Sequence, residues 1–139
     1  MVPQHVIKRD GRVVDFDFEK IHQAMVAAGT ASGDGRAELA GYRLSQPRYG
    51  EPRRGEAVLI VVSEAFTDKT RVKTDGGHPD EFPVIKLNEA RDFQTGVYDY
   101  NLMTSVFSAL TAVNDRPAGA VTKVSFSAQE WCGHVYSQL

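Results

Sequence analysis

The sequence predicts an α+β chain that is mostly β: an N-terminal β-hairpin and one helix, followed by an antiparallel β sandwich or barrel-like domain. A strong turn dipeptide predicts the hairpin, and apolar residues at helical spacing directly after it predict the helix. After residue 36, short β-branched and aromatic runs alternate with turns rich in Gly and Pro, which is typical of all-β domains. We therefore expect a hairpin and helix at residues 1–32, a linker at 33–36 and a β-rich domain at 37–139.

The hairpin prediction depends on Asp10-Gly11, which lies between apolar residues. A type I′ turn needs positive φ at both central positions, and Asp-Gly is among the pairs that adopt it. Asp17 fits the N-cap of the helix, and Gly29 fits its end. The apolar residues of this helix recur on one face: Phe18, Ile21, Met25 and Ala28.

The β-rich part contains one continuous apolar run at residues 57–62, which predicts a central strand buried on both faces. The segment before it, residues 46–55, is rich in Pro and Gly and is expected to be a turn-rich loop. Helix competes with strand over residues 100–112. The strands that the patterns predict are 37–44, 56–66, 70–74, 84–88, 97–107 and 121–128.

The composition is that of an ordinary globular protein, with 139 residues, 42% of them hydrophobic and 24% charged. The net charge of −2 argues against a general nucleic-acid or anionic-membrane binder. The single cysteine rules out an intrachain disulfide framework. The sequence has neither a signal-peptide pattern nor an apolar run long enough for a membrane helix, so a cytoplasmic location is expected.

The first residues contain three short motifs in fixed order: Ile7-Lys8-Arg9-Asp10-Gly11, Phe16-Asp17 and Lys20-Ile21. Their order and spacing resemble the start of the ATP-cone, the nucleotide-binding regulatory module of ribonucleotide reductases and their repressor. The resemblance covers residues 2–32. A complete ATP-cone continues with further helices that close the pocket, whereas the sequence after Ser32 turns linker-like and then strand-like.

The resemblance implies a site for a purine nucleotide, ATP or dATP, together with Mg²⁺. In that family the hairpin lysine and the lysine of the first helix contact phosphates, so Lys8 and Lys20 take those roles by resemblance. Arg9, Asp17 and Ile21 occupy neighbouring motif positions. Ammonium groups from a strand and a helix can converge on one polyphosphate through charge-assisted hydrogen bonds. The alternative is that the cations of this segment are solvated surface charges.

A second resemblance covers residues 37–139 and depends on segments such as 41–51, 55–60, 95–98 and 129–134. These resemble an uncharacterised bacterial β-rich family of exported or lipid-anchored proteins, sometimes mislabelled as the septum formation inhibitor Maf. The resemblance implies a domain identity but no reaction. Relatives of this kind begin with an export signal and continue past the motif at 129–134. Two partial domains on one chain indicate a truncated or chimeric sequence.

Cys132 and His134 form the most conspicuous local cluster. They are weak candidates for two ligands of a soft metal or for a thiolate–imidazole pair, because a structural zinc site needs four ligands. The alternative, which we favour, is a buried Trp131 and Cys132 that pack under a turn at Gly133.

Two further clusters are predicted more weakly. Four arginines with two tyrosines nearby could hold a phosphate or carboxylate, or could form a solvated loop: Arg43, Arg48, Arg53, Arg54, Tyr42 and Tyr49. An acidic loop could offer oxygen ligands to a divalent cation: Asp75, His78, Asp80 and Glu81. The aromatic residues Tyr98, Tyr100 and Phe107 are expected to be core and rim residues.

Three functions remain open. The first is a non-catalytic binding module whose N-terminal segment binds ATP or dATP. The second is a structural or ligand-binding β-rich domain without nucleotide binding. The third is an enzyme that uses Cys132 and His134. Non-catalytic binding is favoured, because no complete catalytic constellation is present.

Overall fold

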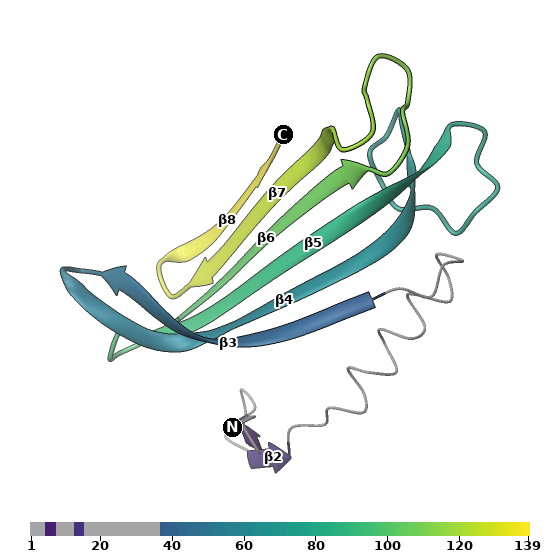
Figure 1. The fold of residues 1–139 in the computed structure, drawn as a ribbon. Helices are drawn as coiled ribbons and strands as arrows, with labels where there is room; N and C mark the ends of the chain where they lie inside the picture. Colours follow the sequence, from purple (N-terminus) through teal and green to yellow (C-terminus); the bar gives the residue numbers. More distant parts are fainter. Residues whose placement is uncertain (1–4, 8–12, 16–36) are drawn as a thin grey trace.

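The structure, a computed structural model, describes residues 5–7, 13–15 and 37–139 (Figure 1). The first two strands, β1 (His5–Ile7) and β2 (Val13–Asp15), pair antiparallel and place Ile7 opposite Val13. A regular two-residue turn at Asp10-Gly11 would instead place Ile7 opposite Val14, so the observed register differs by one residue from the predicted one. The turn itself and the predicted helix at 17–29 lie outside the described residues.

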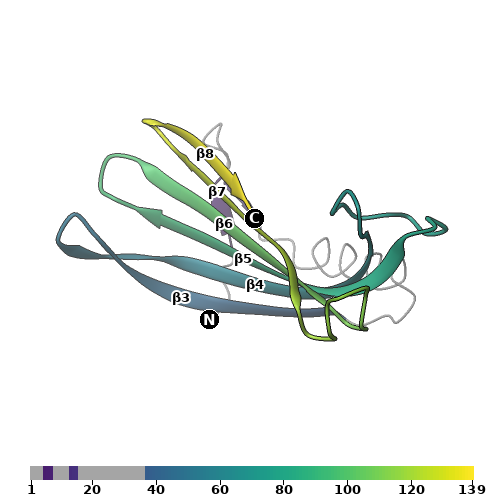
Figure 2. The ribbon, with the colours of Figure 1, turned by 90° about the horizontal axis from the view of Figure 1, so that it is seen from above.

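Residues 37–139 form one six-stranded antiparallel sheet in which every strand pairs with the next strand of the chain. The described residues contain no helix. Figure 2 shows the sheet curling along its length. The strands are β3 (Ala37–Arg48), β4 (Glu51–Thr67), β5 (Glu81–Gln94), β6 (Asp99–Ala109), β7 (Val121–Glu130) and β8 (Gly133–Gln138).

The mostly β, antiparallel prediction is confirmed, but the sandwich or barrel-like arrangement is wrong for residues 37–139. No second sheet forms there, and β3 and β8 lie at opposite ends of the strand order without pairing. The strands are also longer than predicted, and β4 alone runs for 17 residues. The predicted strands 37–44, 56–66 and 84–88 extend to 37–48, 51–67 and 81–94, and these long strands pair in a single sheet.

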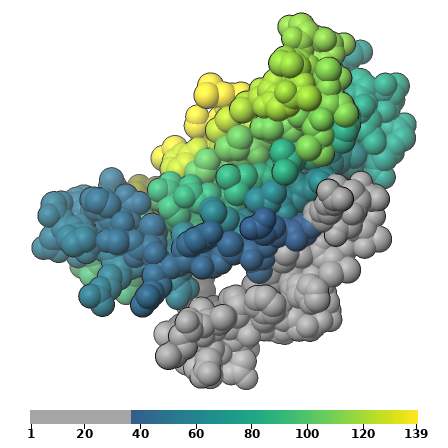
Figure 3. Space-filling view, in the orientation of Figure 1, coloured from purple at the N-terminus to yellow at the C-terminus, as the bar shows by residue number. Residues whose placement is uncertain are grey.

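The segment predicted as a loop, residues 46–55, is a continuation of β3 and β4 around a two-residue turn. Tyr49 and Gly50 have φ of 54° and 75°, as a type I′ turn requires. The prolines are tolerated because Pro47 lies in the end strand β3 and Pro52 lies beyond the β4–β5 ladder, which starts at Gly55. The hairpin therefore projects past the neighbouring strands (Figures 1 and 3).

Of the other strand predictions, some are confirmed and some are wrong. Residues 70–74 are a loop, attached to β4 by a bridge between Phe66 and Lys73 and by hydrogen bonds of Thr67. Within 57–62 only Ala57 and Val62 are buried, because a single sheet does not bury both faces of its strands. Strand rather than helix is confirmed for β6, and β8 was not predicted.

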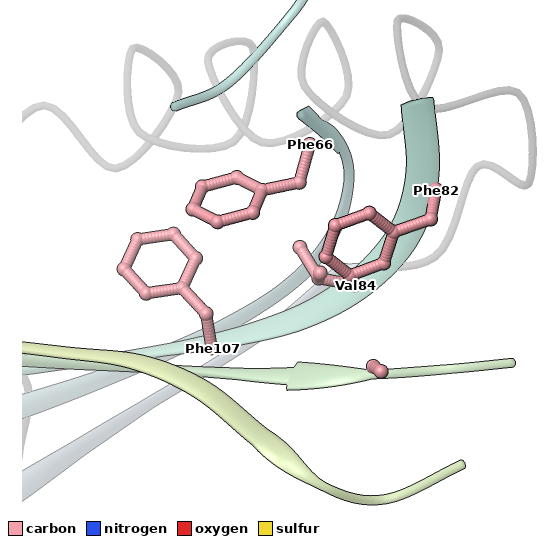
Figure 4. Packing of buried hydrophobic residues seen from close by; sticks show 5 residues of the cluster. Phe66, Phe82, Val84 and Phe107 are labelled. Atoms are coloured by element: carbon pink, nitrogen blue, oxygen red, sulfur yellow. The ribbon is translucent and has the colours of Figure 1, made fainter. Parts of the chain in front are cut away.

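The hydrophobic core lies at one end of the sheet, on the face that we call the inner face. It consists of Phe66, Phe82, Val84, Phe107 and Ala109. The rings of Phe66 and Phe107 stack with centroids 4.9 Å apart, and Phe82 meets Phe66 edge-on at 6.0 Å (Figure 4). These side chains share one face because the register places Phe66 opposite Phe82, and Val84 opposite Ala109.

Two loops meet beside the core and are held together by Asp68. The Asp68 carboxylate accepts hydrogen bonds from Asn114 (2.6 Å) and Arg116, and it lies 3.4 Å from the Arg71 guanidinium. Asp68 belongs to the β4–β5 loop, whereas Asn114 and Arg116 belong to the β6–β7 loop. One carboxylate thus ties the two long connections of the sheet to each other.

Candidate functional site

The residues that the N-terminal motif predicts as nucleotide contacts lie outside the described part of the chain. They are Lys8, Arg9, Asp17, Lys20 and Ile21. Two of these residues, Lys8 and Arg9, come between β1 and β2 in the sequence. The antiparallel pairing of β1 with β2 places Ile7 opposite Val13.

Within residues 37–139, an open groove of about 640 Å³ lies on the inner face, at the end of the sheet away from the core. The register places one polar residue from each of five neighbouring strands in a single row across its floor. We call this the polar row; it consists of Glu56, Asp92, Asn101, Gln129 and His134.

A second row lies beside the polar row and is mostly apolar. Its members are Val58, Ala90, Met103, Ser127 and Tyr136. Of these, Met103 is 45% exposed and Tyr136 is 67% exposed. Sequence reasoning missed both rows because they exist only once the strand register is known. The only signal in the sequence was the alternation of polar residues within single strands.

Glu56 and Asp92 are directly opposite each other on β4 and β5. Partial burial raises the pKa of Asp92, and the nearby carboxylates of Asp99 and Glu56 raise it further, since like charges disfavour ionisation. The carboxylates of the groove are therefore gathered at its β4–β5 end. Such a pairing is unfavourable for the sheet by itself.

An aromatic cluster occupies the turns at the same end of the sheet. The Arg48 guanidinium donates to the Tyr100 hydroxyl (2.9 Å), and the Tyr49 hydroxyl is bonded to those of Tyr100 (2.7 Å) and Tyr98 (3.0 Å). The Tyr100 ring also stacks on Phe93, with centroids 5.0 Å apart. Tyr100 and Phe107 are buried, as predicted for core aromatics.

The hydrogen bonds of this cluster separate the tyrosine pKa values. The hydroxyl bonds from Tyr100 and Tyr98 lower the pKa of Tyr49, and the nearby Arg48 charge lowers it further. The bond to Tyr49 raises the pKa of Tyr98 well above its usual range. The bond to Tyr100 raises the pKa of Arg48. Arg48 thus donates to the cluster, and phosphate or carboxylate binding by the arginine-rich segment stays a prediction.

The arginine-rich segment, for which a solvated loop was one of the two predictions, is instead part of the β3–β4 hairpin. Arg53 lies 3.0 Å from the Glu51 carboxylate and also donates to the Arg48 carbonyl (3.5 Å). The first contact lies within β4, and the second joins β4 to β3 beside the Tyr49-Gly50 turn. Arg48 and Arg53 therefore serve the hairpin itself.

Cys132 and His134 do not form a catalytic pair in the structure. Cys132 lies in the β7–β8 turn, whereas His134 belongs to β8 and lines the groove. Among the hydrogen bonds of residues 37–139, none joins the two side chains. The predicted buried packing is also wrong, because Cys132 is exposed and Trp131 is 75% exposed, with its ring stacked on Tyr98.

We expect the Cys132 thiol to be alkylated slowly at neutral pH. The hydrogen bond and the negative charge of Glu130 raise the thiol pKa, so the reactive thiolate is scarce. Timed alkylation of native protein with iodoacetamide should be slower than that of free cysteine. Glu130→Gln should accelerate it, whereas Glu38→Gln, an exposed carboxylate on β3, should not. Fast alkylation of the unaltered chain would contradict this reading and favour the enzyme hypothesis.

The acidic loop predicted as a cation site is organised by its own contacts. Asp80 accepts a hydrogen bond from the Lys69 backbone (2.9 Å), which lowers the Asp80 pKa, and it also contacts His78. Glu81 accepts one from Thr74 (2.9 Å). In the described part of the chain, no three His, Cys, Asp or Glu side chains gather as a metal site would require. No helix there is both long enough and apolar enough to cross a membrane.

Comparisons with known proteins bear on the N-terminal part of the chain. No curated protein and no solved structure matches the chain. The resemblance of residues 37–139 to an uncharacterised bacterial family stays a prediction, because no family match supports it. A family model described as the ATP cone domain matches residues 4–42, which includes β1, β2 and the first residues of β3.

Proposed function

We propose that the chain is a non-catalytic regulatory module that binds ATP or dATP, with Mg²⁺, through residues 4–42. The observation that carries the proposal is the match of this segment to the ATP cone domain. The match includes all five residues singled out from the sequence motifs. It also extends ten residues beyond Ser32, where the recognisable motif ends, into β3.

Lys8 and Lys20 are the proposed phosphate contacts, with Arg9 as a neighbouring cation. A polyphosphate carries several negative charges within a few ångströms, so two or three convergent cations provide short, charge-assisted hydrogen bonds. The pairing of β1 with β2 supports this assignment, because these strands directly precede and follow the segment that contains Lys8 and Arg9. Asp17 and Ile21 are proposed to border the same site.

We expect millimolar ATP or dATP with Mg²⁺ to raise the midpoint of thermal unfolding of the full chain. A ligand at one hundred times its Kd stabilises the native state by about 2.7 kcal/mol. Lys8→Ala should abolish most of this shift. Lys69→Ala, which removes an exposed lysine of the β4–β5 loop, should leave it intact.

Either of two results would contradict the proposal. Absence of any nucleotide-dependent shift in the unaltered chain would leave the alternative of a structural or ligand-binding β-rich domain. An equal shift in Lys8→Ala and Lys69→Ala would refute the phosphate role of Lys8. Inorganic triphosphate is a useful companion ligand, because it tests the phosphate contacts without the purine.

A further inference from the structure

We propose that the groove on the inner face of the sheet binds a neutral polysaccharide chain that lies across the strands. The residues that line this groove lie between 56 and 136, outside the ATP cone match, which ends at 42. It is built from the polar row and from the mostly apolar row beside it.

The first argument is the spacing of the polar row. Successive strands pair directly, so the row advances by one strand at each residue from Glu56 on β4 to His134 on β8. Arg43 on β3 stands opposite Glu56 and extends the row to all six strands. Neighbouring strands lie about 4.8 Å apart, so six strands span about 24 Å. The spacing between neighbouring strands is similar to the length of one pyranose ring in an extended glycan. One sugar therefore matches one strand.

The second argument is the chemistry of the row. Carboxylates accept hydrogen bonds, and amides both donate and accept them, so Asp92, Asn101 and Gln129 together suit vicinal hydroxyl groups. Asn101 and Gln129 are both exposed, and they stand opposite each other on β6 and β7. The neighbouring Met103 and Tyr136 offer exposed apolar surface to the carbon-bound hydrogens of sugar rings. Concave sites with apolar walls and a few placed polar groups are the common form of ligand sites.

The third argument is charge. Arg43 and Arg54 lie on the same face as Glu56, because alternate residues of a strand share a face and Arg43 pairs with Glu56. Asp99 lies two residues before Asn101 and thus also on this face. Two cations, Arg43 and Arg54, therefore share this face with three carboxylates. The carboxylates are those of Glu56, Asp92 and Asp99. This near balance disfavours polyanions and strongly cationic chains, and it suits an uncharged polyol.

The test is affinity electrophoresis of the full chain in native gels that contain a soluble cellulose ether, a xylan or a galactomannan. At least one gel should retard the unaltered chain. Gln129→Ala and Tyr136→Ala should each weaken the retardation about fivefold, as expected for the loss of one hydrogen-bonding or packing group. Tyr42→Ala is the matched control, because Tyr42 is 55% exposed and lies on the opposite face of β3.

Several outcomes would overturn the proposal. These are no retardation in any polysaccharide gel, retardation that survives both groove substitutions, and retardation only in an additional gel that contains polylysine. The last would show that the carboxylates recruit cations instead. Lys8→Ala should bind polysaccharide like the unaltered chain, so loss of nucleotide binding and loss of polysaccharide binding are distinguishable.

Discussion

Phe66→Ala is expected to lower the free energy of unfolding by about 3–5 kcal/mol. Phe66 is fully buried, and its ring contacts both Phe82 and Phe107. Its removal opens a cavity in the only cluster of buried hydrophobic residues found in the described part of the chain. Domains are typically stable by only 5–15 kcal/mol, so this loss is a large fraction of the total. Urea unfolding followed by fluorescence measures it.

Tyr42→Ala provides the matched control for the Phe66 experiment. Tyr42 is 55% exposed, so its removal should change the free energy of unfolding by no more than about 0.5 kcal/mol. If the two substitutions had similar effects, the cluster around Phe66 would not be the main source of stability for the sheet.

Gly55→Ala is expected to destabilise the sheet by about 1–3 kcal/mol, the usual cost of inserting a carbon into a packed site. A Cβ at Gly55 would overlap the Asp92 carbonyl oxygen and lie 2.6 Å from the Phe93 Cβ. Both obstacles belong to β5, where Phe93 is directly opposite Gly55 and Asp92 is the residue before it. The strands must separate locally, which shifts Phe93 and with it the stacked Tyr100 ring. Urea unfolding reports the loss, and near-ultraviolet circular dichroism reports the tyrosines.

Gly41→Ala is the control for Gly55→Ala. Gly41 also lies in a strand, but a Cβ there would meet nothing within 4 Å. Its substitution should be neutral or slightly stabilising, because alanine loses less conformational freedom than glycine on folding. Equal destabilisation by the two substitutions would show that backbone preference, rather than contact with Phe93, explains the need for glycine at position 55.

The sequence predicted the existence of most strands but not their lengths. Residues 57–62 identified β4, because a continuous apolar run is a strong strand signal. Its continuation to Glu51 was missed, since Pro47, Gly50 and Pro52 read as a loop. Those prolines are compatible with strands only because they lie beyond the β4–β5 ladder or in an end strand. Which strands pair beside a proline is set by the whole fold and cannot be predicted from a short stretch of sequence.

The two candidate sites also differ in how far the sequence alone could predict them. The N-terminal motif could be identified from residues 7–21 alone, because it depends on residue identity and spacing along the chain. The polar row could not, because its members come from five strands and are up to 78 positions apart, between Glu56 and His134. Conversely, Cys132 and His134 looked like a pair, because residues two apart share a face of a regular strand. Cys132 lies in a turn, however, so this rule does not apply to the two residues.

The measurement that tests the central claim most directly is a titration of isotopically labelled full chain with ATP and Mg²⁺, followed by amide nitrogen–proton correlation spectra. Saturable shifts should appear within residues 4–42, with Lys8 and Lys20 among the most affected, while the amides of Phe66 and Phe107 in the core stay unchanged. Shifts confined to residues 43–139, or no saturable shift at all, would contradict nucleotide binding by the ATP-cone-like segment.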